Sequence, residues 1–191
     1  PVAVFISGSG SNLQSLIEAC EDPSFPAKIV LVISNRPDVK GLDRARAADI
    51  KALTIDHKAY PTRTEFEAAL NAALDASPAK LVCLAGFMRV LSADFVRPWQ
   101  GRILNIHPSL LPSFKGLHVQ QQAIDAGVKF SGCTVHLVTP DLDDGPIIGQ
   151  AVVPVLADDD ANTLSARIMI EEHKLYPDCL AILARRLMPL G

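Results

Sequence analysis

The first half of the chain alternates between short, uninterrupted apolar runs and segments in which apolar residues recur with helical periodicity. A strand buried on both faces of a sheet carries such a run, because neither face meets water. The runs predict strands over residues 2–6, 28–34, 51–55 and 80–86, and the segments between them predict helices over 13–20, 40–48 and 63–76. Strand and helix therefore alternate, which predicts a mostly parallel sheet with helices on both faces.

The second half begins with residues 102–112, which have the pattern of a short buried strand ending in two prolines. A helix is predicted over 118–126, followed by strands over 130–139 and 147–155. Because a short acidic loop joins these two strands, we expect a hairpin-like excursion or an antiparallel addition to the sheet.

The C-terminal segment predicts a long helix that begins near Asn162 or Thr163, since both residue types cap helices. Pro177 lacks a backbone N–H, so we expect it to break or restart this helix, with a last segment running to about Leu187. These patterns predict one Rossmann-like α/β domain over 1–191, with a mostly parallel twisted sheet, helices on both faces and an antiparallel addition in the C-terminal half.

Composition narrows the class of protein. Hydrophobic residues make up 49% of the 191 positions and the net charge is only −3, so the chain can bury a core and carries no basic patch for nucleic acid or membrane. No apolar run approaches the roughly 20 residues of a membrane span. The cysteines are isolated in apolar contexts and predict buried free thiols in a reduced, cytoplasmic protein; they are Cys20, Cys83, Cys133 and Cys179.

Two polar residues, Asn105 and His107, stand at the end of the strand within 102–112. Side chains two positions apart in a strand point to the same face, so an amide donor and a titratable imidazole would share one region. Asn105 can stabilise an oxygen that acquires charge, and His107 can move a proton near neutral pH. Asp143, in the acidic loop 140–146, would hold His107 charged if the two lie close, although spare acids on a surface loop fit the same sequence.

Other chemistries fit this region less well. Ser109 lacks the Gly-x-Ser-x-Gly pattern of a serine hydrolase. The histidines show no HExxH or comparable ligand spacing, so we expect no catalytic metal.

The segment Ser7-Gly8-Ser9-Gly10-Ser11-Asn12 lies between the first strand and the first helix. Its backbone N–H groups suit an anion, although a simple tight turn remains an alternative. The dinucleotide fingerprint needs a small residue where the chain has Leu13 and an acid where it has Asn35, and no Walker pattern is present. A single phosphate bound by Gly10, Ser11 and Asn12 is the remaining functional prediction.

These motifs together resemble those of the folate-dependent formyltransferases. The resemblance spans nearly the whole chain and rests on the segments 6–14, 84–89, 105–112, 115–118, 135–138, 142–146, 172–173 and 176–177. It implies transfer of a formyl group from the co-substrate 10-formyltetrahydrofolate to the amine of glycinamide ribonucleotide. It also implies a cis peptide between Leu111 and Pro112.

The resemblance assigns roles to individual positions. Asn105, His107 and Asp143 match the catalytic residues of the family, and Gly10, Ser11 and Asn12 match its phosphate-binding turn. The positions that match the rest of the glycinamide ribonucleotide site are Gly86, Pro108 and Glu172. Those that match the folate pocket are Arg89, Leu91, Val96, Val138, Thr139, Pro140 and Asp141. Residues 1–100 would then form a phosphate-binding half and 101–191 a folate-binding and catalytic half of a monomer or homodimer.

The chain also departs from the family at two positions. Asp144 stands where a glycine is common, which adds a charge to the loop and stiffens it, and Met169 stands where a polar residue often faces the nucleotide. Two other functions fit the same motifs. One is a formyltetrahydrofolate deformylase, a hydrolase that normally has an extra N-terminal domain. The other is a folate- or nucleotide-binding module without turnover. A methionyl-tRNA formyltransferase would carry a further C-terminal nucleic-acid-binding domain, which we do not expect here.

Overall fold

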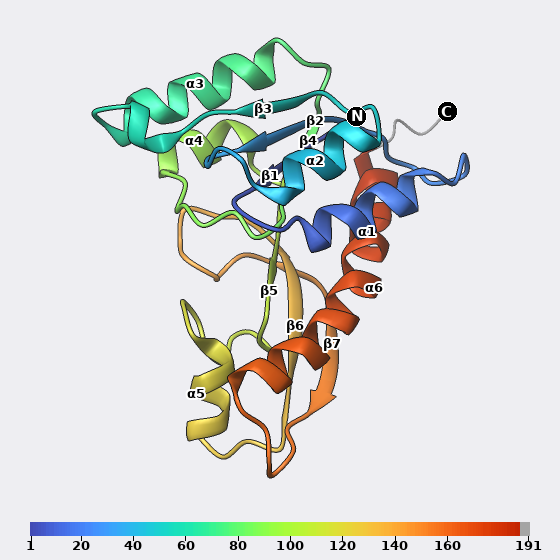
Figure 1. Cartoon of the computed structure of the whole chain (residues 1–191), viewed down its shortest axis with the longest axis vertical. Helices are drawn as coiled ribbons and strands as arrows, with labels where there is room; N and C mark the ends of the chain where they lie inside the picture. Colours follow the sequence, from blue (N-terminus) through green and yellow to red (C-terminus); the bar gives the residue numbers. More distant parts are fainter. Residues whose placement is uncertain (188–191) are drawn as a thin grey trace.

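A computed structural model describes residues 1–187 of the chain (Figure 1). Seven strands form one sheet in the order β3-β2-β1-β4-β5-β6-β7. The strands are β1 (Val2–Ile6), β2 (Ile29–Ser34), β3 (Ala52–Thr54), β4 (Leu81–Leu84), β5 (Ile103–His107), β6 (Phe130–Leu137) and β7 (Ile147–Pro154). The helices are α1 (Ser11–Cys20), α2 (Lys40–Ala47), α3 (Arg63–Asp75), α4 (Ala93–Val96), α5 (Val119–Asp125) and α6 (Ala161–Leu187), with short 3₁₀ turns at His57–Ala59 and Arg97–Trp99.

The sheet has a parallel part and an antiparallel part. The strands from β3 to β5 are parallel to their neighbours, whereas β6 is antiparallel to both β5 and β7. The predicted mostly parallel sheet with an antiparallel addition is therefore confirmed. Its strand order reverses between β1 and β4, and open α/β sheets bind their ligands at the carboxyl ends of the strands beside such a point.

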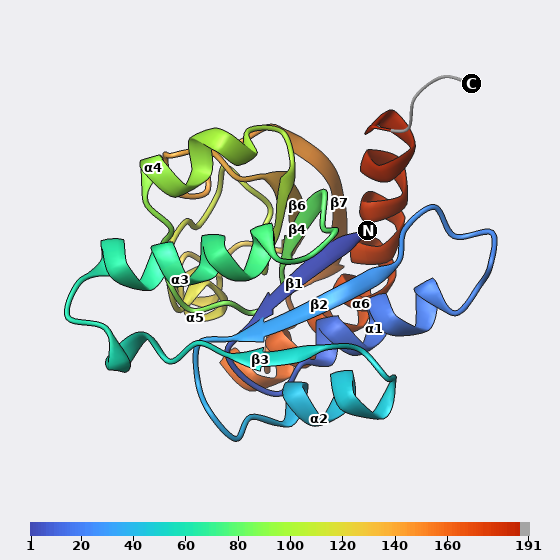
Figure 2. The ribbon, with the colours of Figure 1, turned by 90° about the horizontal axis from the view of Figure 1, so that it is seen from above.

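The inner strands of the parallel part, β1, β2, β4 and β5, are buried almost throughout, as their apolar runs predicted, whereas β3 at the edge of the sheet is partly exposed. Along β1, Val2, Val4 and Ile6 pack with α1 and α6, whereas Ala3 and Phe5 point to the opposite face and pack with α3 and α4. Figure 2 shows these two layers, with α3 and α4 on one side of the sheet and α1, α2 and α6 on the other. The two helical layers leave the carboxyl ends of the strands uncovered.

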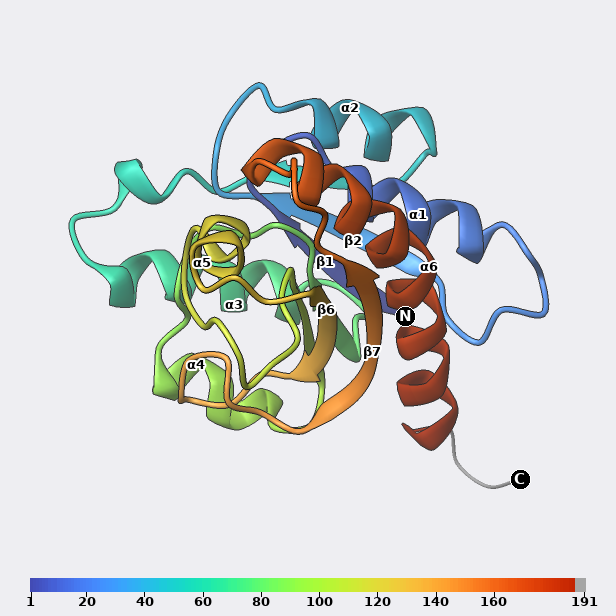
Figure 3. The ribbon, with the colours of Figure 1, turned by 90° about the horizontal axis from the view of Figure 1, so that it is seen from below.

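A third, smaller core lies at the far end of β6 and β7. Apolar side chains from α5, the two strands and the first half of α6 meet there; they include Ala123, Cys133, Val153, Leu164 and Ile168. Figure 3 looks at this end of the molecule, where α5 and the first turns of α6 lie next to one another. This cluster fixes α5, which begins immediately after the loop that approaches the site.

The prediction that Pro177 breaks the last helix was wrong. The helix α6 runs from Ala161 to Leu187 with Pro177 inside it. A proline within a helix costs about 3 kcal/mol. The residues around it are nevertheless buried against the sheet, among them Tyr176, Cys179, Leu180 and Leu183, and this burial outweighs the lost backbone bond.

The start of α6 also differs from the prediction. Asn162 and Thr163 lie within the first turn, and the backbone N–H of Thr163 donates to the carboxylate of Asp160 at 2.8 Å, so Asp160 caps the helix. The Thr163 hydroxyl accepts from the backbone N–H of Asp160 in return. The Leu111–Pro112 peptide is cis, as expected.

Residues 1–187 include no helix that is long and apolar enough to cross a membrane. Nor is any group of three or more His, Cys, Asp and Glu side chains in this part of the chain arranged to hold a metal ion.

Candidate active site

A cavity of about 700 Å³ opens at the carboxyl ends of β1, β4 and β5, next to the reversal in strand order. The residues predicted from the sequence that line it are Ser11, Asn12, Gly86, Arg89, Leu91, Asn105, His107, Pro108, Val138, Thr139, Pro140, Asp141, Asp143 and Glu172. Gly10 and Val96 are not part of this lining. Segments from both halves of the chain therefore meet around one space.

Asn105 and His107 lie on the same face of β5, as the strand periodicity predicted, while Leu104 and Ile106 belong to the core under α1 and α6. His107 is 6% exposed, and its Nε2 lies 2.8 Å from the carbonyl oxygen of Phe114, to which it donates. Its Nδ1 therefore faces Oδ2 of Asp143 at 3.7 Å. This separation is too long for a direct hydrogen bond but short enough for the carboxylate to stabilise a charged ring.

The position of Asp143 is fixed by its own backbone and by the neighbouring loop. The residue has φ of 51°, in the left-handed region, and its carboxylate accepts a hydrogen bond from the backbone N–H of Gly116 at 2.9 Å. Gly145, two residues later, passes so close to Leu137 that a Cβ atom on it would lie 1.7 Å from the Leu137 carbonyl oxygen. The loop after β6 is thus folded tightly enough to turn the Asp143 carboxylate inward, where its side chain is 7% exposed.

A further histidine, His136, stands beside these groups and was given no role from the sequence. It is paired with Asn105 across the antiparallel strands, and its Nε2 lies 3.4 Å from Nδ2 of Asn105 and 4.0 Å from Oδ1 of Asp143. Burial lowers the pKa of His136, which favours the neutral ring. Its Nδ1 lies 3.0 Å from the carbonyl of Leu137, so the neutral ring donates there and presents Nε2 as an acceptor to Asn105. The position of His136 beside Asn105 follows from the β5–β6 register, which the sequence alone does not give.

The turn before α1 has the geometry that an anion site requires. Gly10 has φ of 72° and approaches Gly41 at the start of α2 so closely that a Cβ atom at Gly10 would lie 2.7 Å from the Cα of Gly41. Ser11 and Asn12 follow at the first turn of α1, where backbone N–H groups lack partners within the helix. The role of Gly10 is therefore to shape the turn, while its two neighbours reach the cavity.

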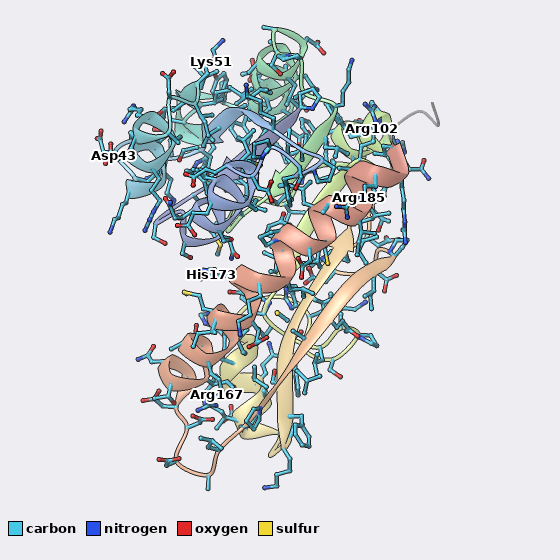
Figure 4. The ribbon with its side chains drawn as sticks, turned by 90° about the vertical axis from the view of Figure 1, so that its right-hand side faces the viewer. Asp43, Lys51, Arg102, Arg167, His173 and Arg185 are labelled. Atoms are coloured by element: carbon cyan, nitrogen blue, oxygen red, sulfur yellow. The ribbon has the colours of Figure 1, made fainter. Side chains whose placement is uncertain are left out.

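A second, shallower cavity of about 470 Å³ shares Ser11 with the first and contains positively charged groups that sequence reasoning missed. Arg44 of α2 donates from Nε to the carbonyl of Ser9 at 2.8 Å, which holds its guanidinium beside the turn. Within residues 1–187 no carboxylate forms an ion pair with it. His173 lies on α6 where that helix passes α1 (Figure 4), and burial lowers its pKa.

Glu172 lines the same cavity as Asn12, Asn105 and His107. It is 8% exposed, and burial raises its pKa to about 7, although a hydrogen bond from Asn12 acts in the opposite direction. At neutral pH this carboxyl group can therefore accept or donate a hydrogen bond in the cavity.

The cavity is apolar between the loop after β4 and the segments before α5 and after β6. Large hydrophobic side chains that stay exposed line this part, and they are Met88, Val90, Leu117 and Leu142, while Met169 lines the cavity from α6, three residues before Glu172. Exposed apolar groups gathered around one space favour a flat, largely apolar ligand. Val96, the last residue of α4, is 2% exposed and packs in the core instead of lining the cavity.

Asp144 and Met169, the two residues that depart from the family pattern, lie on the loop after β6 and on α6. The Asp144 carboxylate forms a 2.6 Å ion pair with Nζ of Lys115, which links the loop after β6 to the segment before α5. This pair lowers the pKa of Asp144. Met169 faces the cavity from α6 and is 37% exposed.

Comparison with known proteins places the chain among related sequences. The family described as Formyl transferase matches residues 1–180. The chain is 52% identical over 190 residues to the trifunctional purine biosynthetic protein adenosine-3 of Bos taurus, matching 100% of this chain and 19% of that protein. It is 45% identical over 176 residues to the phosphoribosylglycinamide formyltransferase of Escherichia coli (strain K12), matching 92% of this chain and 83% of that one.

Solved structures of related proteins have the same fold as this chain. The glycinamide ribonucleotide transformylase 1 of Symbiobacterium toebii superposes with a TM-score of 0.94 at 48% identity, over 100% of this chain and 90% of that one. The phosphoribosylglycinamide formyltransferase of Brucella melitensis gives a TM-score of 0.92 at 51% identity, over 100% and 97%. The chain spans about a fifth of the length of the trifunctional relatives that it matches. On the match to residues 1–180 and these identities, the chain belongs to the formyl transferase family.

Proposed function

We propose that the chain transfers the formyl group of 10-formyltetrahydrofolate to the amine of glycinamide ribonucleotide, a step of purine biosynthesis. The observation that carries this proposal is the meeting of Asn105, His107 and Asp143 at one wall of a cavity that is also lined by Ser11 and Asn12 of the turn before α1 and by exposed apolar side chains. The names of the relatives support the same reaction.

In the proposed mechanism the neutral amine attacks the formyl carbon, a C–N bond forms, and the carbonyl electron pair moves to the oxygen. Asn105 donates to this oxygen, and the protonated ring of His107 adds a second N–H and a positive charge. The intermediate collapses when the bond between the formyl carbon and the folate N10 breaks, and the electron pair goes to that nitrogen. A proton passes from the new ammonium group to the departing nitrogen, with Asp143 and His107 assisting.

The nucleotide would occupy the end of the cavity near α1. Its phosphate would bind at the turn of Gly10, Ser11 and Asn12, with Arg44 supplying a positive charge from the side. Glu172, buried beside Asn12, would accept hydrogen bonds from the ribose, and Gly86 and Pro108 would border the glycinamide portion. This arrangement directs the amine toward β5.

The folate would occupy the apolar part, between the loop after β4 and the segment 138–143. Arg89 and Leu91 line one side, and Val138, Thr139, Pro140 and Asp141 line the other. Residues 1–100 then act mainly as the phosphate-binding half and 101–191 as the folate-binding and catalytic half. We further propose a cytoplasmic enzyme that needs no metal and acts as a monomer or homodimer.

A hydrolase that releases formate is the competing reaction, because the same three side chains can activate a water. The test measures conversion of 10-formyltetrahydrofolate by absorbance, with and without glycinamide ribonucleotide. We expect turnover only when the amine is present. Equal turnover without it would favour the deformylase, and no turnover under either condition would favour a binding module.

A further inference from the structure

Two buried polar residues outside the cavity, Ser7 at the end of β1 and Asn35 at the end of β2, connect the sheet to the loop that follows β4. Ser7 is 3% exposed and Asn35 is 1% exposed. The Ser7 hydroxyl donates to Oδ1 of Asn35 and accepts a hydrogen bond from the backbone N–H of Met88 at 2.8 Å. Because a hydroxyl has a single proton, committing it to Asn35 leaves a lone pair for Met88.

The orientation of the Asn35 amide is fixed from its other side. Its Nδ2 lies 3.1 Å from Nδ1 of His57, in the 3₁₀ turn that follows β3. The same Nδ1 lies 3.1 Å from the backbone carbonyl oxygen of Asn35, and it accepts from the amide when the ring carries its proton on Nε2. With the amide nitrogen on that side, Oδ1 faces Ser7. Asn35 stands where dinucleotide-binding folds carry an acid for the ribose, but here its side chain is used inside the protein.

The loop held by Ser7 has few other attachments. Gly86 turns the chain with φ of 71°, and Met88 and Val90 are 58% and 60% exposed. Among the described residues, Met88 supplies the one backbone N–H of Gly86–Leu91 that has a hydrogen-bond partner. The ring of Phe87 packs on Phe5 with centroids 5.4 Å apart, and Leu91, at the end of the loop, is 7% exposed and packs in the core. Ser7 therefore holds the middle of the loop, between these two apolar contacts.

We propose that Ser7, oriented by Asn35, is a positioning residue that sets the place of the Gly86–Leu91 loop and thereby the affinity of the cavity for the folate. This proposal rests on the function proposed above. The loop forms one side of the apolar part of the cavity, and its remaining backbone groups are free to bind a ligand. Loss of the Met88 bond lets the loop shift, so that ligand contacts are lost although neither Ser7 nor Asn35 touches the folate.

The primary test compares Ser7→Ala with Ser34→Ala. Ser34 is a matched control because it is also buried at a strand end, and its hydroxyl accepts from the backbone N–H of Arg36 at 3.1 Å, away from the loop. One net hydrogen bond corresponds to about tenfold in affinity. We expect Ser7→Ala to raise the KM for 10-formyltetrahydrofolate about tenfold, with kcat within about twofold of that of Ser34→Ala. The KM for glycinamide ribonucleotide should rise by clearly less, because only Gly86 at the start of the loop borders that substrate.

A second measurement does not require turnover. Binding of tetrahydrofolate is followed by calorimetry, and exchange of the Met88 amide hydrogen is followed by NMR. Ser7→Ala should weaken binding about tenfold and speed the exchange, whereas Ser34→Ala should change neither. If Ser7→Ala does not fold, Ser7→Cys keeps the side-chain volume with a weaker acceptor and should move both readouts in the same direction.

The coupling to Asn35 is tested with a double-mutant cycle. Asn35→Ala should raise the folate KM, and Ser7→Ala combined with Asn35→Ala should be no worse than Ser7→Ala, because both act through the same bond. Unchanged Met88 exchange, or equal increases in the KM of both substrates, would overturn the positioning role. Absence of tetrahydrofolate binding by the unaltered chain would instead contradict the proposed function itself.

Discussion

Replacement of Asn105 by alanine tests the centre of the proposed mechanism. The change removes the amide that would donate to the developing oxyanion and leaves His107 and Asp143 in place. Asn105 is only half-buried, and its nearest partner is Nε2 of His136 at the long distance of 3.4 Å. Its loss should therefore lower the free energy of unfolding by less than about 1 kcal/mol.

The expected effect on catalysis is much larger. Removal of one oxyanion donor costs about 10²–10³ in kcat, or roughly 3–4 kcal/mol of transition-state stabilisation. Because this exceeds the loss of folding stability several-fold, the two effects can be separated. The KM of each substrate should change little, since the donor acts on charge that appears only after attack.

The assay is steady-state formyl transfer at saturating concentrations of both substrates, together with thermal unfolding of each variant. Asn105→Asp serves as a control, because it keeps the size of the side chain but replaces the donor with a negatively charged acceptor, and its kcat should be at least as low. A kcat for Asn105→Ala within about fivefold of the unaltered enzyme would refute the oxyanion role.

Three further predictions address binding and stability. Arg44→Gln should raise the KM for glycinamide ribonucleotide about tenfold, whereas Arg46→Gln on the same helix should not, and a dephosphorylated substrate should abolish the difference. Because burial raises the pKa of Glu172 from 4.5 to about 7, the folded protein binds a proton that the unfolded chain releases; stability should therefore fall between about pH 4.5 and 7, and Glu172→Gln should flatten that decline in denaturant titrations. Tyr176→Phe removes a buried hydroxyl that donates to the carbonyls of Leu84 in β4 and Leu104 in β5, so the free energy of unfolding should drop by about 1–2 kcal/mol in the same titrations without a change in KM.

The sequence predicted those features that depend on short-range periodicity. The shared face of Asn105 and His107 follows from the two-residue repeat of a strand, which holds wherever the strand lies in the fold. The tight turn before α1 was equally local, since Gly10 is needed for its left-handed backbone conformation; that it binds an anion stays a prediction. The failure at Pro177 has the opposite origin, because the local cost of a proline was outweighed by contacts with strands that are distant in sequence.

Features that depend on contacts between segments distant in sequence could not be predicted from the sequence. The close approach of Gly10 to Gly41 and the position of Arg44 require knowledge of how α1 packs on α2. Val96 matches a position of the folate pocket in the family, yet it lies behind the cavity wall. Position within a motif therefore identifies the region of a site more reliably than it identifies the side chains that reach the ligand.

The antiparallel addition explains why the three proposed catalytic side chains meet. The connection from β5 to β6 passes through α5, and β6 then runs antiparallel to β5, which sets His136 directly opposite Asn105. The chain then leaves β6 beside Ile103, where the backbone N–H of Val138 still donates to the Ile103 carbonyl, and the following loop folds back over the same face of β5. Asp143 reaches His107 through that return path, so the change of strand direction is what brings residues separated by 36 positions (143 minus 107) to one wall of the cavity.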